Sequence, residues 1–446
     1  MNKQRISLSD HFTYKRLFIF TLPPILMMIF TSVYGVVDGL FVSNCVGKTA
    51  FAAINLIMPF IMILGGIGFM IGTGGTALVA KVLGIGDSEK ANRYFSMMII
   101  FTIILGVILT AVGVAFTEKA ARILGAKDEM IKDCVLYGRI SILFTVAFML
   151  QNVFQSFFVA AEKPKLGLFA ILAAGFTNIG LDALFVAVFG WGVAGAALAT
   201  GLSQCIGGVL PVIYFAGKNS SRLRLVKTGL SLKPLVDACI NGSSELMSNI
   251  SASVISMIYN MQLLLYIGND GVSAYGVLMY VQFVFIAIFI GYAIGSAPVV
   301  SFHYGAQNHG ELKNMLRKST MLMLSLGAVL SAAAFFLAPA FSKMFVGYDY
   351  ELYTLTNHAF KFFAISFLLS GFNIYVSSFF TALNNGAVSA AVSFLRTLVF
   401  QTSAVIILPL ILGVDGIWWA ITVAEICAFI ISVIFLFAKK NEYKYM

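Results

Sequence analysis

The sequence contains few charged residues and few cysteines. Asp, Glu, Lys and Arg make up 11% of its 446 residues, whereas a soluble globular chain carries about 25%. The five cysteines are scattered, without a CxxC pair or a Cys/His spacing suited to a metal, so we expect neither a disulfide framework nor structural zinc. The Walker A, HExxH and GxSxG motifs are also absent, which leaves ATP-driven transport and hydrolysis without support.

Long apolar segments dominate what the sequence does contain. Hydrophobic residues make up 60% of the chain, and segments of roughly 20 apolar residues can cross a bilayer as helices. The polar and basic start at residues 1–16 precedes an apolar segment that is too long for a cleaved signal peptide, so we interpret this segment as a retained first span. We predict an all-α integral membrane protein with twelve spans, at about residues 17–42, 55–80, 94–116, 135–158, 165–189, 193–216, 235–266, 272–300, 319–341, 358–382, 387–411 and 415–438.

The net charge of +10 fits a membrane protein better than a nucleic-acid-binding protein. When the N-terminus is placed inside the cell, most Lys and Arg residues fall in inner segments, as the positive-inside rule requires. Loop 117–134 is the exception, and we expect it to lie as a short amphipathic segment on the outer surface. We therefore expect a multi-pass protein of the plasma or inner membrane, with both termini cytoplasmic, in contact with membrane lipid and without a nucleic-acid partner.

The two halves of the chain repeat each other. A shift of 221 positions aligns the second and eighth spans without a gap and places VxxxxGIGD at 79–87 opposite VxxxxGAQN at 300–308. Each half has six spans, so the halves have parallel topology and a pseudo-two-fold axis along the membrane normal. We predict an N-lobe at 1–216, a cytoplasmic linker loop at 217–233 and a C-lobe at 234–446, with a central cleft between the lobes. The aligned pairs are Gly47 with Gly268, Ala53 with Ala274, Gly74 with Gly295, and Gly84 with Gly305.

Polar side chains occur at a common depth in three spans of the N-lobe. Asp38 lies near the outer end of the first span, Asp182 lies near that of the fifth, and Thr200 follows the start of the sixth. At about 1.5 Å per residue, the three lie roughly 6–12 Å below the outer helix ends, and Asn178 lies one turn from Asp182. Carboxylates inside a membrane are costly and indicate function. This set of oxygen atoms suits a hard cation such as Na⁺, and a carboxylate pair also suits reversible proton binding.

The repeat supports a functional interpretation of these four residues. The scaffold repeats but the acids do not, because the equivalent positions of the second half are Tyr259, Val399, Ser403 and Ile421. The alternative is a buried hydrogen-bond network that holds the lobe together.

Several motifs together resemble those of the MATE (multidrug and toxic compound extrusion) family over essentially the whole chain. They are VxxxxDGLFVS at 33–43, GTGGTALVAKVLGIGD at 72–87, TNIGLD at 177–182, GVAGAALATGLSQ at 192–204 and NGSSELMSN at 241–249. The resemblance implies a V-shaped, two-lobe antiporter that exports organic cations, drugs or toxic metabolites in exchange for inward H⁺ or Na⁺. We expect no enzyme activity, no cofactor besides the coupling ion, and no obligate protein partner, so that the protein is a monomer.

The resemblance also assigns roles to individual residues. The family's N-lobe cation site corresponds to Asp38, Asn178, Asp182 and Thr200. The positions that match its substrate cavity are Tyr34, Tyr137 and Gln155, together with the acid early in span seven, Glu245. Segment 358–382 contains no Asp or Glu, unlike the branch that uses a span-ten carboxylate, and this favours the N-lobe as the coupling site.

Alternatives remain for the charged residues of the C-lobe and for the cargo. Glu245 could bind cargo or a coupling ion, or it could pair with Arg396 or Lys361; we interpret Glu425 as a structural hydrogen-bonding group. The alternative function is that of a lipid-linked precursor flippase of the same superfamily. Flippases handle anionic lipid phosphates with several Arg and Lys residues, whereas here acids outnumber bases within the spans, which favours cationic cargo.

Overall fold

The computed structural model describes residues 6–126 and 128–446, and within these residues it contains helices and no strand. The predicted all-α fold class is therefore confirmed. The first half comprises α1 (Tyr14–Cys45), α2 (Lys48–Ile85), α3 (Ser88–Ile123), α4 (Asp128–Leu143), α5 (Thr145–Ala160), α6 (Pro164–Asp182), the π-helical segment η1 (Ala183–Val188) and α7 (Gly192–Ala216). The second half comprises α8 (Leu232–Tyr266), α9 (Asn269–Gly305), α10 (His309–Val346), α11 (Tyr350–Ala382), α12 (Gly386–Phe394), the π-helical segment η2 (Leu395–Gln401), α13 (Thr402–Leu412) and α14 (Val414–Tyr443).

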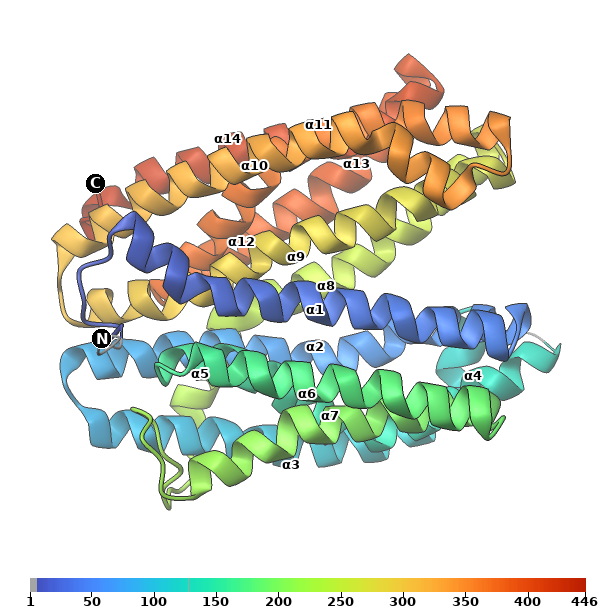
Figure 1. Ribbon diagram of the computed structural model, residues 1–446. Helices are drawn as coiled ribbons and strands as arrows, with labels where there is room; N and C mark the ends of the chain where they lie inside the picture. Colours follow the sequence, from blue (N-terminus) through green and yellow to red (C-terminus); the bar gives the residue numbers. More distant parts are fainter. Residues whose placement is uncertain (1–5, 127) are drawn as a thin grey trace.

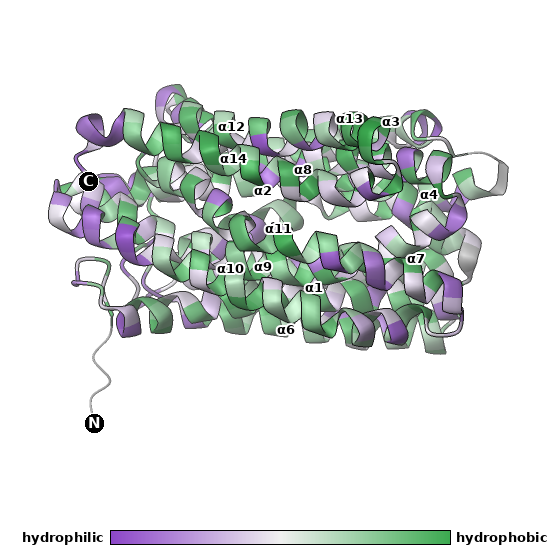
Figure 2. Ribbon diagram, turned by 90° about the horizontal axis from the view of Figure 1, so that it is seen from above, coloured by the Kyte–Doolittle hydropathy of each residue, from purple (hydrophilic) through white to green (hydrophobic). Residues whose placement is uncertain are grey.

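The helices have the length and composition of membrane spans. Ten helices in the described part of the chain are long and apolar enough to cross a bilayer. Helices α4 and α5 together form a further span that is bent by 58°. Helix α8 is long enough, with 35 residues, but is more polar, and it packs along α2. Figure 2 shows hydrophobic residues along the middle of the bundle and hydrophilic residues gathered at its two ends. Counting α8, the described chain has the twelve spans that the sequence predicts.

The fourth span, predicted as one helix at 135–158, consists of two helices that meet at a bend. Helix α3 continues to Ile123 and α4 already begins at Asp128, so the segment 117–134 belongs largely to two helices rather than to a surface loop. The bend lies at Phe144, where the Thr145 hydroxyl donates a hydrogen bond to the Ile142 carbonyl (2.7 Å). A side-chain bond of this kind offers the backbone an alternative to regular helical bonding.

The chain folds into two helical bundles that correspond to its halves, α1–α7 and α8–α14 (Figure 1). The start of α1 and the end of α14 lie at the same end of the molecule, which we call the terminus end. The bundles lie close together there and diverge toward the opposite end (Figure 1). Helix α2 of the first bundle packs against α9 of the second, and α1 packs on both α6 and α9. Helix α1 is therefore in contact with both bundles.

The repeated glycines explain the close approach at the terminus end. A side chain at Gly84 of α2 would collide with the Phe302 carbonyl of α9, and one at Gly305 of α9 would collide with the Lys81 carbonyl of α2. The two glycines are aligned by the 221-residue repeat, and each meets the helix of the other, as a two-fold axis requires. The last residues of the repeated motif are Asp87 and Asn308, which accept hydrogen bonds from Lys90 N and Glu311 N and so cap α3 and α10.

The segment that precedes α1 joins the two bundles at this end. On one side, Glu162 accepts hydrogen bonds from Ser7 Oγ (2.7 Å), Leu8 N (3.0 Å) and Arg222 Nη1 (2.8 Å). On the other side, Glu311 of α10 accepts from Phe12 N (2.9 Å) and contacts His11 Nδ1 (2.7 Å). Leu8 and Phe12 are fully buried. We call residues 7–12 the N-terminal strap.

Candidate functional site

Three helices of the first bundle bring the predicted acid cluster together. Helix α1 carries Asp38, α6 carries Asn178 and ends at Asp182, and α7 carries Thr200. The side chains of Asp182 and Thr200 lie beside that of Asp38, and Asn178 Nδ2 lies 3.5 Å from Thr200 Oγ1. The structure thus places all four residues in one cluster, at the point where α6 continues as the π-helical segment η1. Such π-helical turns occur frequently at functional sites.

The cluster has more acceptors than donors. Asp182 and Asn178 are fully buried and Asp38 is 8% exposed. No described residue donates a hydrogen bond to four of their buried oxygens, namely Asp38 Oδ1, Asn178 Oδ1 and both Oδ atoms of Asp182. Two buried carboxylates that face each other without a donor between them are strongly unfavourable. The geometry therefore favours the addition of a cation or a proton.

Two tyrosines and a glutamine complete the surroundings of the cluster. Tyr137, on the bent helix α4, is 1% exposed and approaches Asp38, Asp182 and Thr200. Tyr34, one turn before Asp38 on α1, accepts a hydrogen bond from Gln151 Nε2 (3.4 Å). We expected Tyr137 to line a substrate cavity, and the structure places it against the acid cluster. Gln151 was not singled out from the sequence, since one amide in an apolar span gives no indication of its partner.

The other two predicted cavity residues lie elsewhere. Gln155 on α5 is buried, and neither atom of its amide has a hydrogen-bond partner among the described residues. Glu245 on α8 is half-buried and lines a separate cavity of about 310 Å³. We call this cavity the C-lobe chamber. Its walls come mainly from α8, α9, α11, η2 and α14, and the first bundle contributes Thr73, Thr76 and Ser156.

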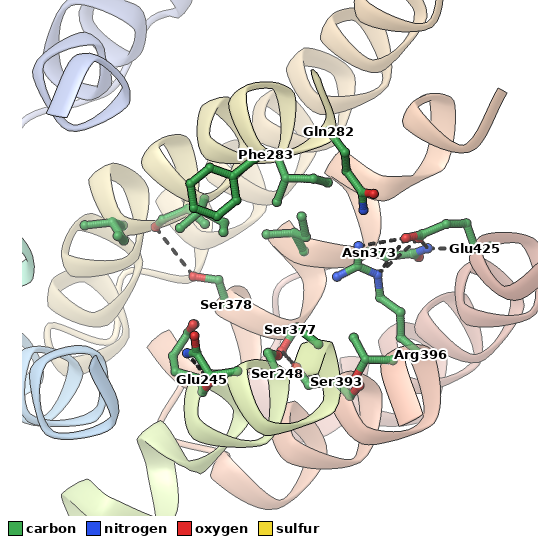
Figure 3. A pocket seen from close by; sticks show the side chains of 18 of the residues that line it. Glu245, Ser248, Gln282, Phe283, Asn373, Ser377, Ser378, Ser393, Arg396 and Glu425 are labelled. Carbon is green, nitrogen blue, oxygen red and sulfur yellow. Dashed lines mark hydrogen bonds and ion pairs between the residues drawn. The ribbon is translucent and has the colours of Figure 1, made fainter. Parts of the chain in front are cut away.

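A buried ion pair forms one side of the C-lobe chamber (Figure 3). Arg396 of η2 donates to Glu425 of α14 through Nε (3.0 and 3.1 Å) and Nη2 (2.7 Å). Asn373 of α11 donates a further hydrogen bond to Glu425 Oε2 (2.7 Å). Arg396 therefore pairs with Glu425 and not with Glu245, which decides one alternative left open by the sequence. The signal available in the sequence was one charge in each of two consecutive spans, a pattern that indicates a partner inside the membrane.

The ligand types of the acid cluster indicate which ions it could bind. Among the described residues, no group of three His, Cys, Asp or Glu side chains could hold a metal ion. The acid cluster offers two carboxylates, an amide and a hydroxyl instead. This is the ligand type of a hard cation and not that of zinc or copper.

A family model, MatE, matches residues 23–184 and 246–406, which cover most of both bundles. The chain belongs to the MatE family. The two matched segments coincide with the two halves of the internal repeat, and the first contains three of the four residues of the acid cluster. The protein is therefore a multi-pass membrane protein of the MATE transporter type.

Similar proteins agree with this assignment. The multidrug export protein MepA of Staphylococcus haemolyticus is 25% identical over 420 residues, which cover 94% of this chain and 92% of MepA. MepA of Staphylococcus aureus is 25% identical over 419 residues, with 93% and 92% covered. These comparisons give no support to the flippase alternative.

Solved structures of MATE proteins have the same fold. A crystal structure of a MATE protein in complex with MaL6 superposes with a TM-score of 0.93 at 21% identity, with both chains fully covered. An outward-facing multidrug resistance MATE transporter of the MOP superfamily superposes with a TM-score of 0.92, also at 21% identity and with full coverage of both chains. The predicted two-lobe architecture of twelve spans is thus confirmed.

Proposed function

We propose that this MATE protein is a secondary active antiporter that exports organic cations in exchange for inward H⁺ or Na⁺. The observation that carries the proposal is the acid cluster, in which four buried oxygens of Asp38, Asn178 and Asp182 have no hydrogen-bond donor among the described residues. A proton would supply the missing donor between the carboxylates, and Na⁺ would bind the same oxygens directly. Either ion cancels part of the negative charge of the site.

The coupling ion and the cargo would be linked through the conformation of the protein. An ion shifts such an equilibrium only through its different affinity for the two states. Helix α1 carries Asp38 in the first bundle and packs against α9 of the second, where Gly291 and Gly295 allow contact with residues 21–25. Ion binding at Asp38 therefore acts on a helix that contacts both bundles. If the coupling is about 1–3 kcal/mol, the external ion weakens cargo binding roughly 5- to 150-fold.

Transport driven by each ion separately tests the proposal. A pH gradient and a Na⁺ gradient are applied separately to inverted membrane vesicles that contain the protein. The gradient of the coupling ion should drive uptake of a fluorescent organic cation into the vesicles. Asp38→Asn should abolish uptake driven by the coupling ion, and Glu351→Gln, which changes an exposed carboxylate at the start of α11, should leave it unchanged. Driven uptake at the wild-type rate in Asp38→Asn would refute the proposed coupling site.

The proposed orientation places the terminus end in the cytoplasm. It rests on the Lys and Arg residues in the segments at this end, including the linker 217–233. In a cysteine-free background, an impermeant thiol reagent added to intact cells should label Tyr348→Cys, in the α10–α11 turn, and should not label Lys227→Cys, in the linker. Both positions are exposed, so the opposite labelling pattern would mean that the orientation is reversed.

A further inference from the structure

The internal repeat reveals a helix face that is covered in the first bundle and open in the second. In the first bundle the linker runs along α3, where Asn92 and Ser96 each accept a hydrogen bond from a backbone N–H of the linker, both at 2.8 Å. The 221-residue shift, which also aligns the caps of α3 and α10, places Lys313 and Arg317 of α10 at these two positions. Ser96 is buried, whereas Lys313 and Arg317 are exposed. The described chain therefore covers this face on α3 and leaves it open on α10.

The open face of α10 is basic at its start and apolar further along the helix. Lys313, Arg317 and Met321 are four residues apart, so they lie on one side of the helix, and all three are exposed. Two turns further on, Val329 continues this side and is 62% exposed. No described residue forms a hydrogen bond or an ion pair with Lys313 or Arg317. The stripe thus passes from unpaired positive charges at the terminus end to side chains that suit hydrocarbon.

The start of α1 forms the second side of this surface. The Tyr14 hydroxyl donates a hydrogen bond to Met321 Sδ (3.1 Å), and Phe18, one turn further along α1, is 55% exposed. The ammonium group of Lys318 lies 5.5 Å from the centre of the Tyr14 ring and donates a hydrogen bond to the Phe12 carbonyl (2.7 Å). Tyrosines are enriched at the level of lipid headgroups. Tyr14 therefore marks the level at which this surface passes from headgroups to hydrocarbon.

Positive charge outweighs negative charge at this place. Two acids lie there: Asp10, which is 3.9 Å from Arg16, and the buried Glu311, whose carboxylate is bonded to the N-terminal strap. Clusters of about four to eight Lys and Arg residues at the cytoplasmic end of membrane helices are typical of binding to anionic lipids. The first turn of α1 and the first ten residues of α10 together supply five basic residues, namely Lys15, Arg16, Lys313, Arg317 and Lys318.

We propose that this surface binds an anionic phospholipid of the cytoplasmic leaflet. We call it the α1–α10 edge and define it by Tyr14, Phe18, Lys313, Arg317 and Met321. The phosphate of the lipid lies between Lys313 and Arg317, and an acyl chain follows Met321 and Phe18. An acidic peptide fits this surface less well, because the exposed stripe continues into the apolar part of α10.

The bound lipid has a structural consequence for α1. It takes on α10 the place that the linker has on α3, and it contacts the start of α1 at the same time. It therefore holds α1, which carries Asp38, against the second bundle. The leaflet follows from the proposed orientation, whereas the binding itself depends neither on that orientation nor on the proposed antiport.

Two lipids with the same acyl chains and different headgroups test the proposal. The purified full-length protein in detergent is titrated with phosphatidylglycerol, which is anionic, or with phosphatidylcholine, which is neutral overall. Native mass spectrometry measures the dissociation constant of the first bound lipid. A Lys or Arg residue near an anionic membrane surface contributes roughly fivefold in affinity. We expect the wild-type protein to bind phosphatidylglycerol at least about tenfold more tightly than phosphatidylcholine.

Two double variants assign this preference to the α1–α10 edge. Lys313→Gln/Arg317→Gln removes two exposed charges and should weaken binding of phosphatidylglycerol by roughly 10- to 25-fold, with little effect on phosphatidylcholine. The matched control, Lys227→Gln/Lys233→Gln, removes the same charge from exposed positions in the linker and at the start of α8. It should keep the wild-type affinity for both lipids.

Three results would overturn the proposal. Equal affinity of the wild-type protein for the two lipids would rule out an anionic headgroup, and this measurement does not depend on any variant. Equal weakening by the two double variants would show a diffuse attraction to the whole terminus end. Displacement of phosphatidylglycerol by inorganic phosphate, with potassium chloride at equal ionic strength as the control, would identify a free anion as the ligand. None of these results bears on ion coupling, which is tested at Asp38 and Asp182.

Discussion

Replacing Asp182 by asparagine removes one negative charge from the acid cluster and hardly changes the size of the side chain. The new amide also supplies a hydrogen-bond donor beside Asp38, which is within hydrogen-bonding reach of Asp182. In the wild-type cluster, by contrast, four buried oxygens have no donor among the described residues. The folded variant should therefore be stable without a cation bound at this site.

The expected effect on stability can be given a size. A buried acceptor without a donor costs about 1–3 kcal/mol. At high pH and without Na⁺, Asp182→Asn should thus be more stable than the wild type by about this amount. A coupling ion at a hundred times its Kd stabilises the wild type by about 2.7 kcal/mol, provided that it binds only the folded state. The variant should gain little or none of this stabilisation.

Thermal unfolding of the purified protein in detergent measures both effects. The unfolding midpoint is followed from pH 8 to pH 5 without Na⁺, and separately at pH 8 as NaCl increases, with a potassium salt at equal ionic strength as the control for screening. Glu351→Gln controls for the loss of an exposed carboxylate on another helix. The wild-type midpoint should rise with one of the two ions, and that of Asp182→Asn should start higher and stay nearly constant.

One outcome would refute the reasoning about the acid cluster. If Asp182→Asn unfolds at a lower temperature than the wild type without a cation, and still responds to the ion as strongly, then the carboxylate has a partner in the folded protein and the coupling ion binds elsewhere.

Two further predictions concern the terminus end. At the N-terminal strap, burial acts to raise the pKa of Glu162, but the hydrogen bonds from Ser7, Leu8 and Arg222 outweigh it and hold this pKa below its ordinary value of 4.5. Because the folded-state pKa is the lower one, these bonds stabilise the protein above about pH 4.5 and are lost as the pH falls through the folded-state pKa. Glu162→Gln should therefore lower the free energy of unfolding by about 1–2 kcal/mol at pH 7, since Arg222 is partly exposed, and the difference should shrink below pH 4 in acid-unfolding curves; a difference that is constant with pH would contradict the role of the carboxylate. At the crossing of α2 and α9, Gly84→Ala should reduce transport and increase amide hydrogen exchange at 81–85 and 302–306, because its methyl group collides with the Phe302 carbonyl. The matched control is Gly276→Ala in α9, where a methyl group meets nothing within 4 Å; equal effects of the two substitutions would contradict the close approach.

The sequence alone determined three kinds of feature: those set by the length of apolar segments, by the internal repeat and by the regular rise of a helix. Apolar length predicts the spans whatever their neighbours, because lipid forces each span to satisfy its backbone as a helix. The 221-residue repeat aligned Gly84 with Gly305. Both positions are glycine because each lies against the backbone of the other helix, which leaves no room for a side chain. The fixed rise of a helix gave Asp38, Asp182 and Thr200 a common depth, and the structure places them together.

Only the tertiary structure decided which side chains face one another. In a membrane the lipid-facing and the buried faces of a helix are both apolar, so hydropathy says little about the rotation of a helix about its axis. It also does not predict a bend such as that at Phe144, because packing sets both. The resemblance matched Tyr137 to a substrate cavity, and the structure places it against the acid cluster. The charge of Arg396 was visible in the sequence, but several acids were available to it. The choice of Glu425, which leaves Glu245 free in the chamber, required the positions of α8, η2 and α14 in space.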